Sequence, residues 1–295
     1  MPWHRIGWSG TGSWKKQDKA DCLQQEHMKA IGKNGKDGGI LFQKRLLITG
    51  VLSPRSIAFA IAQAASAEGA EVILTSFGRA MTLTQKSAAR ISGKPDVLEL
   101  DVTRPEQLTA LASSLKERFG NIDGVVHAIG FAPEECLAGG FMTAPWESVA
   151  TALQVSSYSL VSLSQAMRPL FPPDGGAIVA LTFDASRAWP LYDWMGPAKA
   201  ALESATRYLA RDLGKEHIRV NSIAAGPLDT VAAKAIPGFA SLRQLWARGA
   251  PLGWDAGDAT PVADTATFLL SSRARAITGQ IIHVDGGFSS QGAAV

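Results

Sequence analysis

A tyrosine and a lysine seven residues apart, Tyr192 and Lys199, are the side chains of this chain best suited to chemistry. On a single helix of about 3.6 residues per turn, this spacing would bring both to nearly the same face, roughly 10 Å apart along the axis. A phenol can donate a hydrogen bond to a substrate oxygen while an ammonium group holds part of a cofactor. The alternative is a helix that carries Tyr and Lys without function, and the spacing alone does not decide.

The elements that would position this pair are short apolar runs alternating with helix-sized segments. The pattern predicts an α/β fold: one Rossmann-like, doubly wound, seven-stranded parallel sheet with helices on both faces. The expected strands are Arg45–Thr49, Glu71–Thr75, Val97–Leu100, Ile122–His127, Ala177–Leu181, His217–Ile223 and Gln280–Val284. The expected helices are Ile57–Glu68, Glu106–Phe119, Trp146–Leu170, Tyr192–Leu213 and Pro261–Leu270.

The first 42 residues differ from the rest of the chain. They lack helical or strand periodicity, so we expect a disordered N-terminal extension over 1–42 and one folded domain over 43–295. Residues 1–45 hold nine Lys or Arg and four Asp or Glu, which leaves −2 for the remainder of a chain whose formal charge is +3. A nearly neutral body argues against nucleic acid as a partner.

Composition places the chain among globular proteins. Hydrophobic residues make up 46% of it, enough for a core, yet no apolar run reaches the length of a membrane span. The two cysteines, Cys22 and Cys136, have neither disulfide nor metal-ligand spacing, so we expect free thiols, no metal site and a cytoplasmic location.

The first strand is followed by Thr49-Gly50-Val51-Leu52-Ser53-Pro54-Arg55-Ser56-Ile57-Ala58, which is not the G-x-G-x-x-G fingerprint. A dinucleotide site nevertheless needs a strand, a tight turn and a helix N-terminus that faces the pyrophosphate. Gly50 could provide the turn, and Ser56 a hydroxyl beside the helix start. The alternative is that Gly50 is only a turn residue and Ser56 only an N-cap.

Taken together, these motifs resemble the enoyl-acyl-carrier-protein reductases, a divergent branch of the short-chain dehydrogenase superfamily. The main branch uses Tyr-x-x-x-Lys, whereas Met195 stands four residues before Lys199 here and Tyr192 gives Tyr-x6-Lys. Gly-x5-Ser-Ile-Ala after the first strand is also typical of this family. The block from Phe183 to Tyr192 is similar to the mycobacterial type, and the resemblance runs from about Gln43 to about Ser289.

The resemblance implies a function and a cofactor site. It implies NADH-dependent reduction of trans-2-enoyl thioesters on acyl carrier protein in fatty-acid synthesis, by a homotetramer whose C-terminal Asp285-Gly286-Gly287-Phe288 forms part of the assembly. NADPH stays open, because Arg79 could stack near the adenine or attract a 2′-phosphate. The implied cofactor-binding residues are Gly50, Ser56, Ile57, Phe77, Asp101, Val102, Ala128, Ile129, Gly130, Lys199, Gly226, Leu228 and Thr230.

The resemblance also assigns the chemistry. Tyr192 would hydrogen-bond the thioester oxygen as an enolate forms, Lys199 would bind the nicotinamide ribose, and Phe183 would position the thioester. His127 is expected to be structural, and residues of about 228–250 to form a substrate lid, although a surface helix packed on the core gives the same pattern. Two alternatives remain: another short-chain reductase acting on a carbonyl, or a dinucleotide-sensing protein without turnover.

Overall fold

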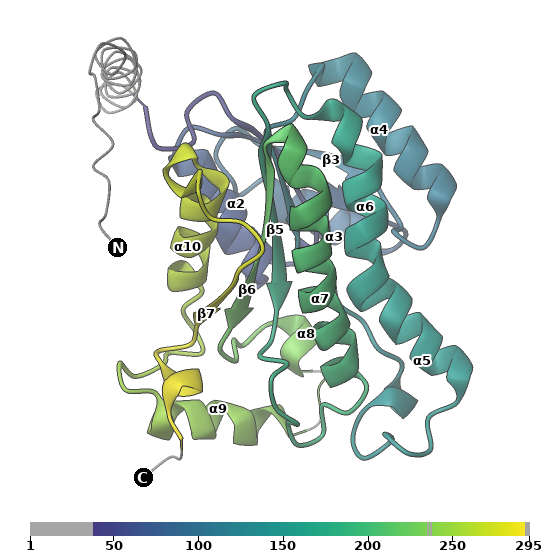
Figure 1. Ribbon diagram of the computed structural model, residues 1–295, viewed down its shortest axis with the longest axis vertical. Coiled ribbons are helices and arrows are strands. Elements are labelled where there is room, and N and C mark those ends of the chain that lie inside the picture. The colour runs from purple at the N-terminus through teal and green to yellow at the C-terminus, as the bar shows by residue number, and fades with distance from the viewer. Residues whose placement is uncertain (1–37, 235, 237, 293–295) are drawn as a thin grey trace, which may run out of the picture. The chain divides into compact units, whose positions relative to one another are not determined.

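Seven parallel strands form one sheet in the order β3-β2-β1-β4-β5-β6-β7, so the predicted sheet is confirmed. The structure, a computed structural model, describes residues 38–234, 236 and 238–292 (Figure 1). The strands are β1 (Arg45–Ile48), β2 (Glu71–Ser76), β3 (Asp96–Glu99), β4 (Gly124–His127), β5 (Gly176–Thr182), β6 (Ile218–Ala225) and β7 (Ile281–Val284).

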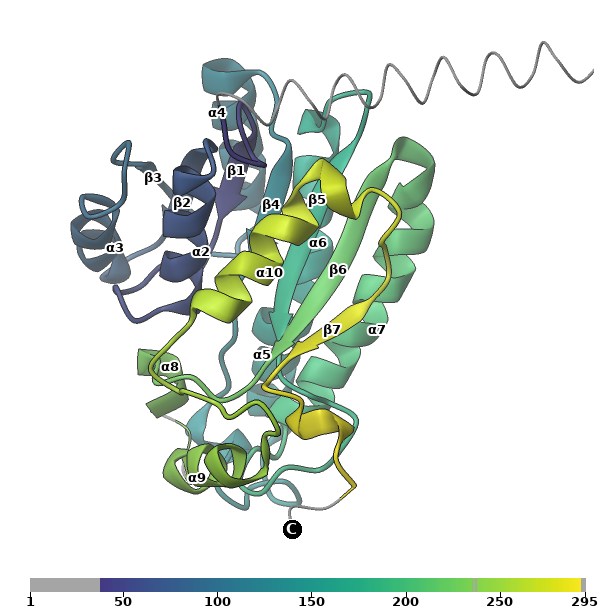
Figure 2. The ribbon, with the colours of Figure 1, turned by 90° about the vertical axis from the view of Figure 1, so that its left-hand side faces the viewer.

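Helices cover both faces of this sheet because the central strands are apolar on both sides. On β1, Leu46 and Ile48 belong to one buried cluster and Leu47 to the other. The first face packs against α2 (Ile57–Ala67), α3 (Ala80–Ala88) and α10 (Thr260–Leu270). The second packs against α4 (Pro105–Phe119), α6 (Ser159–Met167) and α7 (Met195–Leu213), as the two views together show (Figures 1 and 2).

The order of the strands fixes where a ligand can bind. The chain reverses its direction of winding between β1 and β4, and open α/β sheets bind ligands beyond the carboxyl ends of the strands at such a point. Two further helices, α8 (Val231–Lys234) and α9 (Phe239–Gly249), lie across this end of the sheet (Figure 2). The loops after β1, β4, β5 and β6 therefore meet at the carboxyl end of the sheet, next to α8 and α9.

Two helical segments differ from the sequence prediction. The helix expected over Trp146–Leu170 is divided into α5 (Trp146–Leu153), a π-helical turn η2 (Gln154–Tyr158), α6 and a short 3-10 turn η3 (Arg168–Leu170). In the π turn the hydroxyl of Ser156 accepts from the N–H of Phe131 and donates to its carbonyl, at 2.8 and 2.7 Å. Helix α3 was not predicted, because its buried residues are Thr84, Ser87 and Ala88, which carry no apolar stripe.

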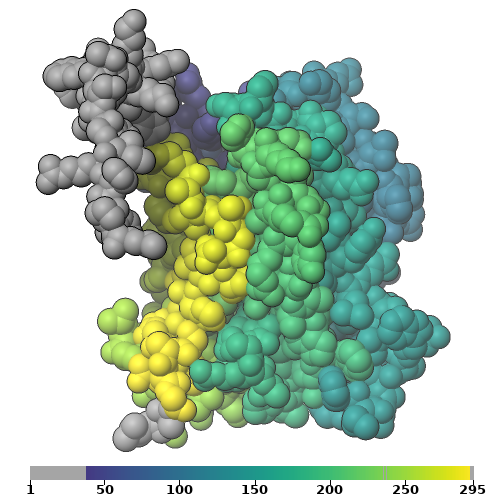
Figure 3. Space-filling model, in the orientation of Figure 1, coloured from purple at the N-terminus to yellow at the C-terminus, as the bar shows by residue number. Residues whose placement is uncertain are grey.

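The folded body begins just before the first strand. Leu41 is fully buried, and the N–H of Ile40 donates to the Glu68 carboxylate at 2.7 Å. Residues 1–37, including Cys22, lie outside the described residues, so the expected disordered extension stays a prediction. No helix among residues 38–234, 236 and 238–292 has the length and hydropathy to cross a membrane. Figure 3 shows β7 and the C-terminal segment as a continuous strip of surface beside α7.

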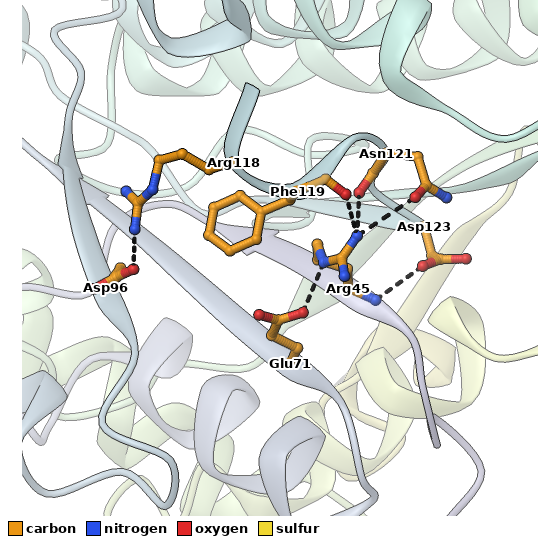
Figure 4. Close-up of polar contacts among 7 residues, drawn as sticks. All are labelled: Arg45, Glu71, Asp96, Arg118, Phe119, Asn121 and Asp123. Atoms are coloured by element: carbon orange, nitrogen blue, oxygen red, sulfur yellow. Dashed lines mark hydrogen bonds and ion pairs between the residues drawn. The ribbon is translucent and has the colours of Figure 1, made fainter. Parts of the chain in front are cut away.

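At the end of the sheet opposite α8 and α9, where the strands begin, Arg45 connects several elements (Figure 4). Its Nε bonds Glu71 at 2.7 Å, and its Nη1 donates to the carbonyls of Phe119 and Asn121 at 2.6 and 2.9 Å. The guanidinium carbon also lies 5.5 Å from the centre of the Phe119 ring. One side chain thereby joins β1, β2 and the end of α4. A lysine could not replace this fork of donors.

Arg45→Met should therefore lower the free energy of unfolding by about 1–2 kcal/mol, because two carbonyls lose their donor. Catalysis should not change, since the substitution lies at the far end of the sheet. Arg118→Met is the matched control: Arg118 also lies over the Phe119 ring, at 4.9 Å, but its ion pair is with the half-exposed Asp96, and exposed pairs contribute about 0–1 kcal/mol. Urea unfolding of the two variants tests this, and equal losses of stability would contradict the role given to Arg45.

Candidate active site

Tyr192 does not lie on a helix with Lys199, which corrects the geometry predicted from their spacing. Helix α7 begins at Met195, and Tyr192 belongs to the turn before it, where its carbonyl accepts from the N–H of Met195 at 2.9 Å. The side chain of Tyr192 is nonetheless buried, and Lys199 is in the first turns of the helix. The two side chains thus come from a turn and a helix, and the argument from one shared helix face does not hold.

The turn that carries Tyr192 has a strained backbone. Leu191 and Asp193, on either side of it, have positive φ angles of 62° and 37°, which non-glycine residues rarely adopt. Contacts with the loop after β4 hold this conformation: the N–H of Gly139 donates to the Asp193 carboxylate at 2.5 Å, and that of Trp194 to the carbonyl of Cys136 at 3.1 Å. Strain of this kind persists where the surroundings enforce it, commonly at functional sites.

Lys199 brings a charged group into the interior. Its side chain is 7% exposed, and Nζ donates to the carbonyl of Leu181 at the end of β5, at 3.0 Å. Burial lowers the pKa of the Lys199 ammonium to about 8, although Glu203 acts in the opposite direction. A Cβ placed on Gly130 would lie 3.5 Å from Nζ, so the ammonium group faces the loop after β4.

Burial has the opposite consequence for the phenol. It raises the pKa of Tyr192 above its ordinary value, and the nearby charge of Glu203 raises it further. The hydroxyl therefore stays protonated at neutral pH and can donate a hydrogen bond to an oxygen that gains negative charge. A neutral donor in a site with little water is well suited to oxyanion stabilisation.

Phe183 packs directly on Tyr192, with ring centroids 5.2 Å apart in an edge-to-face arrangement. It also contacts Trp189 at 5.4 Å and Trp246 at 5.6 Å, and Trp246 stacks on Phe288 at 3.9 Å. The residues predicted for chemistry thus adjoin a continuous aromatic cluster. Sequence reasoning missed Trp189 and assigned Phe288 only to the C-terminal motif, because neither residue has a periodic pattern that connects it with the site.

The predicted lid segment forms α8 and α9, joined to the aromatic cluster through Leu242 and Trp246, which are both buried. Arg243 on α9 pairs with Asp229 at 3.0 Å, and this ion pair joins α9 to the turn after β6. The hydroxyl of Thr230 accepts from the N–H of Ala233 at 3.0 Å and caps α8. These contacts agree with a segment that covers the site, and its role as a lid stays a prediction.

The turn after β1 is built against the end of β4. Gly50 has a φ of 80°, and a Cβ there would lie 2.0 Å from the carbonyl oxygen of Ala128, so only glycine fits. Thr49 joins the same two strands: its hydroxyl donates to the carbonyl of Val126 at 2.9 Å and accepts from the N–H of Ala128 at 3.1 Å. The structure therefore brings together Gly50 and the segment of Ala128, Ile129 and Gly130, as a dinucleotide site requires.

Ser56 stands at the N-cap of α2, which begins at Ile57, but its hydroxyl does not cap the helix. It accepts instead from the N–H groups of Leu52 and Ser53, at 3.1 and 3.0 Å, and so shapes the turn. A hydroxyl that accepts these bonds still has its own proton to donate. The first N–H groups of α2 and this proton form a site suited to a phosphate group.

The residues expected near the adenine lie at the ends of β2 and β3. Phe77 is half exposed after β2, and Val102 is buried after β3. The carboxylate of Asp101 accepts from the N–H and hydroxyl of Thr103, at 3.0 and 2.6 Å. Asp101 therefore shapes its own turn, and its contact with adenine stays a prediction.

The turn after β6 comes close to Trp254. A Cβ on Gly226 would lie 2.7 Å from the indole ring, whose Nε1 donates to the carbonyl of Pro227 at 2.8 Å. Leu228 is buried, and its carbonyl accepts from the N–H of Thr230 at 2.7 Å. This tight turn leads from the carboxyl end of the sheet into α8, where the predicted cofactor contacts of Gly226, Leu228 and Thr230 would lie.

His127 is completely buried at the end of β4. Ser159 donates its hydroxyl proton to the carbonyl of Val155 at 2.6 Å, so Nε2 of His127 must donate to the Ser159 oxygen at 2.7 Å. Burial, together with the smaller effect of the charge of Lys199, lowers the pKa of His127 to about 3. A neutral imidazole held in this way agrees with the structural role expected for it.

Comparison with known proteins identifies the group to which these features belong. A family model described as enoyl-(acyl carrier protein) reductase matches residues 50–289. An NADH enoyl-[acyl-carrier-protein] reductase of Mycolicibacterium smegmatis is 44% identical over 267 residues, covering 86% of this chain and 98% of the relative. The enzyme of the same name from Mycobacterium avium is 41% identical, with 86% and 98% covered. That of Bacillus subtilis is 40% identical, with 83% and 95% covered.

The burial of His127 predicts a specific dependence of stability on acid. Its pKa is about 3 when folded and about 6.5 when exposed, so the unfolded chain binds the extra proton between these values. Stability should therefore fall by on the order of a few kcal/mol as pH decreases from about 6.5 to 3. The free energy of unfolding, measured with denaturant, should depend less steeply on pH below about 6.5 in His127→Gln than in wild type. The control His217→Gln, at an exposed position, should keep the pH dependence of wild type. Parallel curves for wild type and His127→Gln would contradict the assignment.

Proposed function

The chain belongs to the family of NADH-dependent enoyl-acyl-carrier-protein reductases, and we propose how its own residues carry out that reaction in fatty-acid synthesis. It is an oxidoreductase that saturates the trans-2 double bond of an enoyl thioester. The observation that carries the assignment of roles is the burial of Tyr192 and Lys199 at the carboxyl end of the sheet, with Phe183 in contact with the tyrosine ring.

The turn after β1, the start of α2 and the loop after β4 fit a dinucleotide. Gly50 keeps the turn free of side-chain atoms, and Ser56 with the N-terminus of α2 would hold the pyrophosphate. Lys199, which faces Gly130, would donate to the nicotinamide ribose. When bound, NADH supplies a hydride to C3 of the enoyl thioester.

Tyr192 stabilises the charge that follows. As the thioester oxygen becomes an enolate oxygen, the neutral phenol strengthens its hydrogen bond to it, and this lowers the barrier more than it aids ground-state binding. The cation of Lys199 adds a favourable field nearby. Phe183 packs against Tyr192 and restricts where the thioester can lie. Protonation at C2 then completes the reduction.

The two alternative functions are less well supported by the site. A carbonyl reductase of the main short-chain branch would need a tyrosine four residues before Lys199, where this chain has the buried Met195. A dinucleotide sensor would need the turn after β1 but no buried phenol held in a strained turn. The enoyl reductase needs both features.

Three further proposals concern the carrier protein, the assembly and the location of the enzyme. Arg248 is exposed on α9, and with Arg243 it would meet the acidic acyl carrier protein beside the lid. We propose a homotetramer, because β7 is an edge strand of the described sheet and leads into the Asp285–Phe288 turn, where Gly286 and Gly287 are partly exposed. A cytoplasmic location is proposed from Cys136, which is a free thiol in the core.

One spectrophotometric assay tests the proposed reaction and its range of substrates. The enzyme should oxidise NADH faster than NADPH with crotonyl and dodecenoyl thioesters, and should leave a ketoacyl thioester unchanged. The rings of Trp189 and Trp246, with centroids 5.0 Å apart, occupy apolar space beside Phe183. A long acyl chain should therefore bury few additional methylene groups there. Each methylene left in water forgoes up to about 0.8 kcal/mol.

We therefore expect kcat/KM to be highest for short-to-medium chains. A value that keeps rising beyond about sixteen carbons, at about 0.8 kcal/mol per methylene, would contradict the inferred size of the acyl site. Reduction of the ketoacyl thioester in preference to the enoyl thioesters would contradict the proposed reaction itself.

Substitution of the two polar residues should separate their roles. Tyr192→Phe should lower kcat by about 10²–10³-fold, because one oxyanion donor is lost, and should leave the affinity for NADH near that of wild type. Lys199→Met should weaken NADH binding and turnover together. Equal losses of NADH affinity in both variants, measured by cofactor fluorescence, would refute this division of roles.

A further inference from the structure

Glu203 lies one helical turn after Lys199 on α7, and none of the contacts so far described explains why an acid is there. Residues four apart on a helix are neighbours on its surface, with Cβ atoms about 5–6 Å apart. The head groups of the pair are tied to consecutive residues at the end of β5. Nζ of Lys199 donates to the carbonyl of Leu181 at 3.0 Å, and Oε1 of Glu203 accepts from the hydroxyl of Thr182 at 3.1 Å.

The buried ammonium group needs a negative charge near it. None of the ion pairs within 4.0 Å among the described residues includes Lys199, and the other polar groups of the site do not provide a negative charge. His127 is neutral and Tyr192 is protonated, for the reasons given above. Within the part of the chain that the structure describes, Glu203 is the carboxylate that raises the pKa of Lys199, opposing the larger effect of burial.

Glu203 is itself held in place by groups other than Lys199. Besides Thr182, the backbone N–H of Ala185 donates to its carboxylate. The charges that face it from neighbouring elements are Asp184 on the loop after β5 and His283 on β7, and these two lie 3.7 Å apart. Partial burial raises the pKa of Glu203, while the two hydrogen bonds oppose this effect and favour the carboxylate.

We propose that Glu203 is a positioning residue that acts as the counter-charge of Lys199: its carboxylate, fixed at the end of β5, keeps the buried ammonium group protonated at neutral pH and so maintains its hold on the cofactor ribose. This proposal rests on the proposed function of Lys199. It gives the acid a role in cofactor binding although it contacts neither cofactor nor substrate.

The test uses an isosteric substitution. Glu203→Gln keeps a carbonyl oxygen that can accept from Thr182 and Ala185, but it removes the charge. Thr182→Val is the matched control, because it removes a hydrogen bond from Glu203 and keeps the charge. NADH affinity is measured by cofactor fluorescence from pH 6 to 9.5 for the full-length wild type and both variants, and kcat/KM for crotonyl thioester is measured alongside.

In wild type, NADH affinity should fall as pH rises through about 8, where Lys199 of the free enzyme loses its proton. In Glu203→Gln the midpoint should move down by on the order of one pH unit, because a neighbouring opposite charge has been removed. The variant should therefore bind NADH like wild type at pH 6 and several-fold more weakly at pH 7.5. Thr182→Val keeps the charge of Glu203 and should therefore move the midpoint less than Glu203→Gln does.

A purely structural role for Glu203 would give a different result. Affinity would then be lost equally at every pH, or the midpoint would not move, and either result overturns the proposal. Should Glu203→Gln fail to fold, Glu203→Asp supplies the test: it keeps the charge and should keep the midpoint, and a downward shift overturns the proposal. If the pH midpoint of NADH affinity moves in Glu203→Gln but the wild-type enzyme does not reduce enoyl thioesters, the proposed function is contradicted. The role of Glu203 as counter-charge of Lys199 is then still supported.

Discussion

The burial of one ammonium group, that of Lys199, is the constraint on which the rest of the site depends. A cation taken out of water is costly unless polar groups surround it. Here the carbonyl of Leu181, at the end of β5, accepts a hydrogen bond from Nζ, and Glu203 supplies the opposite charge. The same low-polarity surroundings keep Tyr192 protonated. Burial therefore produces a fixed cation and a neutral hydrogen-bond donor at the same end of the sheet, and both can stabilise an enolate.

The two ends of the sheet have different roles: contacts at one end contribute to stability, and the other end carries the catalytic residues. At the amino ends of the strands, Arg45 satisfies two carbonyls and a carboxylate together. At the carboxyl ends, Tyr192 lies between Leu191 and Asp193, which both have positive φ angles. The loop containing Cys136 and Gly139 holds that turn through hydrogen bonds. These hydrogen bonds allow the turn to keep a conformation that would be unfavourable in isolation.

Residue patterns predict the sheet well, because strands buried on both faces leave continuous apolar runs between turn residues. They also identified Gly50, whose close contact with Ala128 only glycine permits. The helix start at Met195 was missed, because a backbone turn held by tertiary hydrogen bonds leaves no periodic signal. The π turn at Ser156 and the stack of Trp246 on Phe288 likewise depend on partners distant in sequence.

The central claim is that Tyr192 binds the thioester oxygen while Lys199 binds the cofactor ribose. A crystal structure of the protein with NAD⁺ and a trans-2-enoyl thioester tests it most directly, because that pair cannot react further. The account predicts the Tyr192 hydroxyl at about 2.5–3.0 Å from the thioester oxygen, with Nζ of Lys199 within hydrogen-bond distance of the ribose hydroxyls. A thioester oxygen bound by another group, with the Tyr192 hydroxyl directed away from it, would contradict the account.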